Sequence, residues 1–226
     1  MMNGSVITHV FSDIPIPYKE VLRYSGIRGE CSQNIKNDIL LCLKESKSFL
    51  SPKACFLRTE LKTYGDISDF GIFKVKSEKL SKNLKGCNEA LLFTATVGAG
   101  IDMLINRYSS IKPVKALYFQ AIGAAAVESV CDTLTKEVFL KELKNGEFLR
   151  PRFSPGYGDF SVSYQKELFA VLDCQRKIGV SLTEGGLMAP SKSVTAIVGI
   201  GPKREDCKNG CEVCENITNC PYAKKE

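Results

Sequence analysis

The sequence predicts a single α+β domain with a twisted, mainly antiparallel sheet, flanking helices that include one long helix, and a Cys-rich C-terminal tail. Segments whose apolar residues recur at helical spacing alternate with short apolar segments typical of strands. One segment, 113–144, is long enough for an unusually long helix, opened by Pro113 and closed by Gly146. Four of the ten cysteines lie in the last twenty residues. We therefore expect the folded domain over residues 1–201 and the tail over 202–226.

The predicted helices share apolar positions three and four residues apart, and they are 33–50, 113–144 and 164–173. The predicted strands are short, apolar and bounded by turn residues, and they are 55–61, 70–75, 90–97, 178–183 and 193–200. The first helix should end before Pro52, since proline disfavours helical backbone at the preceding residue. Gly98 to Asp102 links a strand to a helix but lacks the third glycine of a dinucleotide-binding fingerprint. We interpret it as a tight turn whose backbone amides can face a ligand.

The long predicted helix has two kinds of surface. Its core-facing stripe consists of Val127, Val130, Leu134 and Val138. Beside the stripe, another element or a ligand can approach closely at a patch of small residues, Ala121, Ala124 and Ala125. Glu128 continues this patch one turn later. A carboxylate at the edge of an apolar surface needs a hydrogen-bonding partner, although an exposed glutamate on a helix is the commoner situation.

Composition restricts the possible functions. The chain has 226 residues and a net charge of +6, with lysines at 74, 76, 79, 82 and 85. Such a patch can bind nucleic acid or an acidic protein, but no aromatic residues alternate with these lysines, so a solvated helix face is favoured. The single histidine, His9, argues against a Ser-His or Cys-His nucleophile and excludes multi-histidine metal sites. We expect no nucleic-acid partner.

The sequence also predicts a cytoplasmic protein without a membrane span. Its longest apolar stretch, 116–130, is interrupted by Gln120 and Glu128 and is too short to cross a bilayer. The N-terminus lacks the basic and apolar regions of a secretion signal. In a reducing compartment disulfides are rare, and clustered thiols indicate metal or redox chemistry. The scattered cysteines are expected in core or boundary positions, and they are Cys31, Cys42, Cys55, Cys87, Cys131 and Cys174.

The tail cysteines form the pattern Cys207-x-x-x-Cys211-x-x-Cys214-x-x-x-x-x-Cys220. Four soft ligands at short spacing suit an iron–sulfur cluster or a tetrahedral zinc site. The first three have the spacing of radical adenosylmethionine enzymes, but those motifs stand early in the chain, whereas only twelve residues follow Cys214. The tail is therefore predicted to bind a metal, with an iron–sulfur cluster ahead of zinc and flexible reduced thiols as the alternative.

Residues 152–159, Arg-Phe-Ser-Pro-Gly-Tyr-Gly-Asp, combine a fixed cation, a rigid backbone and an aromatic ring. Arg152 offers a planar, permanently charged fork that suits a carboxylate or a phosphate. Pro155 restricts one backbone torsion, and Gly156 permits conformations that other residues resist. Tyr157 adds an apolar face with a polar tip. The segment can bind a small ligand with an anion and a flat ring, and the alternative is a Pro-Gly turn with an incidental arginine.

Three blocks of residues resemble the activation domain of cobalamin-dependent methionine synthase, which binds S-adenosylmethionine and reactivates oxidised cobalamin. The first block is Arg152-x-x-x-Gly156-Tyr157, with the family's proline before the glycine. The third block is Val127-Glu128, where the family has an Ala-Glu pair that contacts the ligand. The second block lies between Leu182 and Val194 and comprises Leu182-Thr-Glu184, Met188, Pro190, Ser193 and Val194. The resemblance covers most of residues 1–201, although Ala189 stands where the fused enzymes carry tryptophan.

The resemblance implies a role for each matching residue. Arg152 would pair with the carboxylate of adenosylmethionine, and Glu128 would accept bonds from its amine or a hydroxyl. The backbone at Pro155 and Gly156 would face adenine or ribose, and Tyr157 would pack against the ligand. The turn that follows would shape the pocket wall or the surface that faces cobalamin, through Met188, Pro190 and Ser193.

The resemblance also implies chemistry and partners. The sulfonium activates the methyl group and reduced cobalt attacks it, so the chain needs no nucleophile and would not be catalytic alone. It would act on a separate cobalamin-dependent methionine synthase that lacks its own activation domain, with flavodoxin or ferredoxin as the electron donor at the lysine patch. One alternative is an iron–sulfur reductive activator of other corrinoid methyltransferases. Another is a non-catalytic ligand-binding or regulatory protein with a zinc-stabilised tail.

Overall fold

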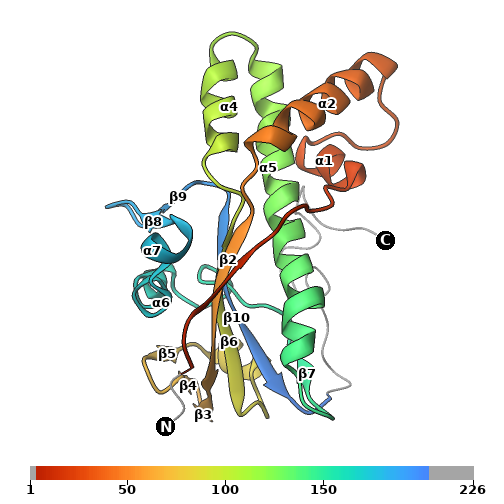
Figure 1. Cartoon of the computed structure of the whole chain (residues 1–226). Helices are drawn as coiled ribbons and strands as arrows, with labels where there is room; N and C mark the ends of the chain where they lie inside the picture. Colours follow the sequence, from red (N-terminus) through yellow and green to blue (C-terminus); the bar gives the residue numbers. More distant parts are fainter. Residues whose placement is uncertain (1–3, 204–226) are drawn as a thin grey trace.

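Three long apolar strands form the centre of a five-stranded antiparallel sheet in the computed structural model, which describes residues 4–203 (Figure 1). The central strands are β2 (Lys53–Glu60), β6 (Glu89–Thr96) and β10 (Ser193–Gly201), and the edge strands are β1 (Ile7–Val10) and β7 (Phe148–Leu149). The strand order is β1-β2-β6-β10-β7. The structure confirms the predicted α+β fold with an antiparallel sheet.

Alternation along the central strands creates two cores, one on each face of the sheet. On β2, Phe56 faces one core while its neighbour Leu57 faces the other. The long helix α5 (Pro113–Thr133) covers the first face. The second face is covered by α3 (Glu78–Asn83), α6 (Gln165–Leu172) and α7 (Cys174–Ile178). Figure 1 shows α5 on one side of the sheet and α6 and α7 on the other.

The remaining helices pack around the first half of α5, beyond the end of the sheet (Figure 1). They are α1 (Tyr18–Tyr24), α2 (Gln33–Ser46) and α4 (Gly100–Ser109). Gly100 starts α4 against the backbone of Phe49, and a Cβ there would lie 2.1 Å from the Phe49 carbonyl oxygen. The turn at 98–102 therefore forms as predicted, but it packs against a neighbouring segment of the chain. Short strands complete the fold: β3 (Lys62–Tyr64), β4 (Ile67–Asp69), β5 (Lys74–Lys76), β8 (Ser181–Leu182) and β9 (Met188–Ala189).

The long helix forms where it is predicted, but it changes its winding before it ends. After Thr133 the chain continues as a π-helix over Leu134–Val138 and a 3-10 helix over Phe139–Glu142. The stripe residues Val127, Val130 and Leu134 are buried as predicted. The stretch Pro113–Glu142 has the length and apolar composition of a membrane span, yet 67% of its most apolar window is buried inside the protein. It is the core helix of this fold.

Two predicted strands are wrong in part. The segment 70–75 is mostly a turn, because the Asp69 side chain accepts a bond from Gly71 N–H and the backbone of Phe70 bonds to Phe73. The two phenylalanines stack on each other at 5.1 Å, so their apolar character serves packing rather than a strand. The segment 178–183 begins inside α7, which Gly179 ends with a φ of 74°. Only Ser181–Leu182 pairs as a strand.

The lysine segment does not form the single helix face that was predicted. Lys74 and Lys76 lie on β5 and pair with Asp69 and Asp66 at 3.1 and 3.7 Å. The lysines at 79 and 82 lie on α3. Five of the six scattered cysteines are buried, and Cys31 is half-buried, as expected for core and boundary positions.

Candidate functional site

A bulge at the edge of the sheet places Arg152. Phe148 and Leu149 pair with Gly201 and Ile200, whereas Phe153 pairs with Ile197, so the edge segment holds one residue more than β10 between these pairings. A bulge re-aims the side chains next to it. Phe153 consequently packs against the second core, beside Phe160, while Arg152 turns toward α5 on the other side of the strand.

Arg152 meets two carboxylates of α5. Its guanidinium donates a hydrogen bond to Glu128 and lies 3.4 Å from Asp132. Burial alone would lower the pKa of Arg152, but the attraction of Cys131, Glu128 and Asp132 raises it above its ordinary value. Burial raises the pKa of the Cys131 thiol to about 12, so this thiol is neutral at pH 7 and the negative charge that faces Arg152 there comes from Glu128 and Asp132. The structure thus joins a permanent cation to the predicted Glu128.

The segment after Arg152 is a tight double turn. Gly156 N–H donates to the Phe160 carbonyl at 2.7 Å, and Tyr157 N–H donates to the Ser154 carbonyl at 3.0 Å. Gly156 and Gly158 have φ angles of 97° and 55°, in the region that only glycine adopts readily. Their conformation presents Tyr157 at the surface, where its side chain is 56% exposed and contacts the ring of Phe153 edge-on.

Asp159 fastens this double turn to α3. Its carboxylate accepts bonds from Ser77 Oγ at 2.5 Å, Glu78 N–H at 2.7 Å and Lys79 N–H at 3.2 Å. The Ser77 bond is the main cause that lowers the pKa of Asp159 below its ordinary value, and the two backbone bonds act in the same direction. Asp159 therefore ties the end of the motif to the first turn of a helix about 80 residues earlier.

We expect Asp159→Ala to lower the free energy of unfolding by about 1 kcal/mol at pH 7, the typical cost of a lost helix cap. Because the folded pKa is depressed, this contribution is present above the unfolded pKa of about 3.9 and is lost as the pH falls through the folded pKa. Urea unfolding at pH 7 and pH 3 should show the difference from wild type shrinking at the lower pH. Glu30→Ala, at an exposed loop residue, is the control, and an equal effect in both variants would contradict the capping role.

A cleft of about 150 Å³ lies between this motif, α5, α6 and β10. The structure brings six of the predicted site residues to its wall, and they are Glu128, Arg152, Pro155, Tyr157, Met188 and Ser193. Four further residues line the cleft without a predicted role: Ser154 and Val194 lie within the matching blocks, whereas Gln165 and Thr195 lie outside them. Alternation along β10 and the helical start of α6 are the only signals that could have suggested Thr195 and Gln165.

Two predicted residues support the cleft without lining it. Gly156 shapes the double turn, and Pro190 precedes the first residues of β10. Ser193 Oγ lies 2.8 Å from the Pro190 carbonyl oxygen and 2.9 Å from Thr96 Oγ1, so it joins the loop to the sheet. The same loop is tied to α4, because Ser191 N–H donates to Asp102 at 2.7 Å.

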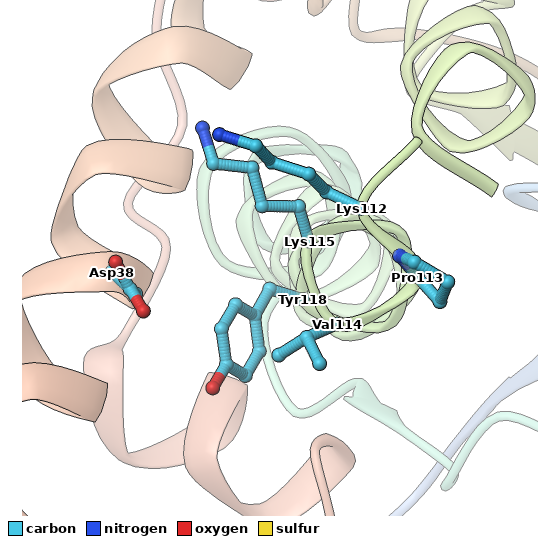
Figure 2. A pocket seen from close by; sticks show the side chains of 6 residues that line it. All are labelled: Asp38, Lys112, Pro113, Val114, Lys115 and Tyr118. Carbon is cyan, nitrogen blue, oxygen red and sulfur yellow. The ribbon is translucent and has the colours of Figure 1, made fainter. Parts of the chain in front are cut away.

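A second, larger hollow of about 320 Å³ lies between α2 and the start of α5. Figure 2 shows Asp38 of α2 on one side, with Tyr118 and the parallel side chains of Lys112 and Lys115 on the other. None of the predicted site residues lines this hollow. The chemistry that the sequence predicts is therefore gathered in the smaller cleft.

The predicted metal site lies outside the described residues, since all four tail cysteines, Cys207, Cys211, Cys214 and Cys220, follow residue 203. Between residues 4 and 203, no group of three or more His, Cys, Asp or Glu side chains could hold a metal ion. The division of the chain at 201 and the metal in the tail stay predictions. The alternative of an iron–sulfur activator depends on those cysteines alone.

The fold and the cleft define an α+β module in which a cation, a carboxylate and uncharged polar groups line one cavity. The family model "Vitamin B12 dependent methionine synthase, activation domain" matches residues 19–210. The chain therefore belongs to the activation-domain family of cobalamin-dependent methionine synthase, as the sequence blocks predicted.

A solved structure shares the fold. The crystal structure of the MetH reactivation domain bound to AdoHcy is similar to this chain with a TM-score of 0.61 and 14% sequence identity, over 90% of this chain and 81% of that chain. At this identity the likeness shows the fold alone. No curated protein matches the chain.

Proposed function

We propose that this chain is an S-adenosylmethionine-binding module that supports the reductive methylation of cobalamin on a separate cobalamin-dependent methionine synthase. The observation that carries the proposal is the Arg152–Glu128 pair at the wall of the cleft. The family supports the role in reactivation. The similar MetH domain has bound AdoHcy, the product that remains when adenosylmethionine loses its methyl group, and this favours the same ligand class here.

The pair fits the amino-acid end of adenosylmethionine, which carries one carboxylate and one ammonium group. A ligand that enters between the two side chains exchanges one ion pair for two, with its carboxylate on Arg152 and its ammonium on Glu128. The guanidinium fork can bind both carboxylate oxygens at once. Because charges of opposite sign replace each other, neither protein group is left buried without a partner.

The cleft must open to accept this ligand. Its volume of about 150 Å³ is below the roughly 300–1,000 Å³ of typical small-molecule sites. The cleft would enlarge if Arg152 separated from Glu128 and Tyr157 moved aside. Arg152 and Glu128 both lie at the solvent side of the cleft, with exposed side-chain fractions of 26% and 36%. The walls on β10 and α6 are buried and would stay in place.

The contribution of the protein to the reaction would be proximity and orientation. The sulfonium already activates the methyl group, and reduced cobalt in the cobalamin of the partner would supply the attacking centre. Arg152 and Glu128 would hold the amino-acid end, and the double turn would cover the ligand and limit the access of water. The module would then be one component of methionine synthase activity and not an enzyme by itself, acting in the cytoplasm.

The proposal predicts that the chain restores activity to a partner. Cobalamin-loaded methionine synthase without its own activation domain is oxidised and then mixed with adenosylmethionine, a chemical one-electron reductant and this chain. We expect turnover to return only when the chain is present, because it alone brings the methyl donor to the cobalt. An equal rate of return without the chain, or none with it, would contradict the proposal.

The same assay tests the electron donor. We propose that an acidic flavodoxin or ferredoxin docks at the lysine segment 74–85, where basic side chains extend from β5 and α3. Charge reversal in this segment should slow reactivation with the protein donor but not with the chemical reductant. The difference should diminish at high salt, since such attraction is screened. A variant as fast as wild type with the protein donor would remove this part of the proposal.

A further inference from the structure

Two polar side chains of the cleft have atoms without a hydrogen-bond partner. Oε1 of Gln165 and Oγ1 of Thr195 are shielded from solvent and make no hydrogen bond in the part of the chain that the structure describes. Gln165 is 8% exposed and Thr195 is 2% exposed, and both line the same cleft. A buried polar atom without a partner lowers stability. Two of them in one cavity indicate a function that outweighs this cost.

The backbone of Thr195 adds an open edge to the same wall. Ile197 directs both its N–H and its C=O to Phe153. Alternate residues of an antiparallel strand direct these groups to the same side, so Thr195 directs its own toward the cleft. On its β6 side β10 is paired along its length. On the side that faces the cleft, the first position with a partner is Ile197, so among residues 4–203 no strand pairs with the first half of β10 there. The wall therefore offers both backbone and side-chain hydrogen-bonding groups.

We propose that Gln165 and Thr195 bind the nucleoside end of adenosylmethionine, an inference that rests on the proposed function. Arg152 and Glu128 occupy the charged part of the cleft and match the amino-acid end, which leaves the uncharged polar wall for adenosine. Adenosine carries an amino group and ribose hydroxyls that donate hydrogen bonds, and ring nitrogens that accept them. Gln165 Oε1 accepts from one of these donors. Since Gln165 and Thr195 already lack contact with water, pairing with the ligand costs them no hydration.

This role has a signature that distinguishes it from a structural one. Methionine has nearly the shape of glutamine, and valine nearly that of threonine, but neither replacement has the unpartnered atom. Removing a buried unpaired polar group leaves the stability of the ligand-free protein unchanged or raises it. The ligand meanwhile loses its partner. Stability and affinity should therefore move in opposite directions, as at many functional sites.

The test is calorimetric titration of S-adenosylhomocysteine into wild type, Gln165→Met and Thr195→Val, with Gln175→Met at an exposed position of α7 as the control. We expect each cleft variant to bind about 10-fold more weakly or worse, with a Tm that is unchanged or up to about 4 °C higher. Unchanged affinity in Gln165→Met, or a Tm that falls together with affinity, would overturn the inference. If wild type itself does not bind, the proposed function fails instead.

A second ligand identifies which hydrogen-bond donor of the nucleoside Gln165 accepts from. S-inosylhomocysteine keeps the ribose and the amino-acid end but replaces the adenine amino group by a carbonyl oxygen. If wild type binds it as weakly as Gln165→Met binds S-adenosylhomocysteine, the amino group is the donor. If wild type binds both ligands equally while Gln165→Met binds both weakly, the donor is a ribose hydroxyl. If Gln165→Met binds both S-adenosylhomocysteine and S-inosylhomocysteine with the affinity of wild type, the nucleoside assignment is overturned.

Discussion

Arg152→Ala is expected to lower the affinity for adenosylmethionine by about 30-fold or more. Truncation of one partner in a hydrogen-bonded charge pair costs about 2–5 kcal/mol, and 1.4 kcal/mol is a factor of ten. In this cleft the loss has two origins. The ligand carboxylate loses its bidentate cation, and it then approaches Glu128 and Asp132, whose charges are no longer compensated. Calorimetric titration of both proteins measures the effect.

Two further variants show that the loss comes from the cleft. Arg176→Ala removes an arginine that pairs with Asp173 at 2.6 Å on an exposed part of α7, and it should bind like wild type. Arg152→Lys keeps the charge but not the fork and should give an intermediate affinity. The Arg152 side chain is only 26% exposed and pairs with two carboxylates, so its loss should also lower stability, and thermal unfolding must show that the variant is folded at the temperature of the titration. Wild-type affinity in Arg152→Ala would show that the carboxylate binds elsewhere.

Phe139→Ala is expected to lower the free energy of unfolding by about 3–5 kcal/mol, the usual cost of removing a buried aromatic ring. Phe139 is fully buried, and its ring packs edge-to-face against those of Phe56 and Phe93, with distances between ring centroids of 5.2 and 5.6 Å. The ring thus joins the end of the long helical stretch to β2 and β6, two of the three central strands of the sheet. The variant leaves a cavity between layers that cannot collapse without moving the sheet.

The position of this ring follows from the change in winding. A π-turn adds a residue to the helical turn, so it rotates the residues that follow relative to a continuous α-helix. The π-helix at Leu134–Val138 precedes Phe139 directly. Urea unfolding of Phe139→Ala should be compared with that of Phe148→Ala, whose ring is 44% exposed on β7 and should matter much less. Similar losses in the two variants would refute the anchoring role.

The local pattern of the sequence was sufficient for most of the fold. The strands β2, β6 and β10 and the helices α2, α5 and α6 appear close to their predicted ranges. They do so because a strand in the sheet, or a helix packed against it, needs apolar residues at a regular spacing, and that spacing is visible within the single segment. The two wrong strand predictions fall where a turn or a helix cap, rather than strand pairing, decides the conformation of the segment. At 70–75 an Asp69 turn and a stacked aromatic pair interrupt the strand, and at 178–183 a glycine cap ends a short helix.

The candidate site was predictable to the extent that single residues carry its chemistry. Arg152, Tyr157 and Glu128 have side chains whose charge or shape suggests a ligand wherever they lie, and all three line the cleft. Gln165 and Thr195 are ordinary residues in a helix and a strand. Their importance comes from being buried without partners, a property that no local pattern reveals.

By itself, the sequence determined the kinds of elements, the family and the residues that carry charge, since these depend on side-chain chemistry and on spacing within one segment. Only the tertiary structure decided how they meet. The bulge that turns Arg152 toward Glu128 exists because the edge segment pairs with a strand about 45 residues later with one residue in excess. The open wall of β10 and the bonds of Asp159 to α3 likewise depend on which distant segments become neighbours, and that choice is made by the packing of the whole domain.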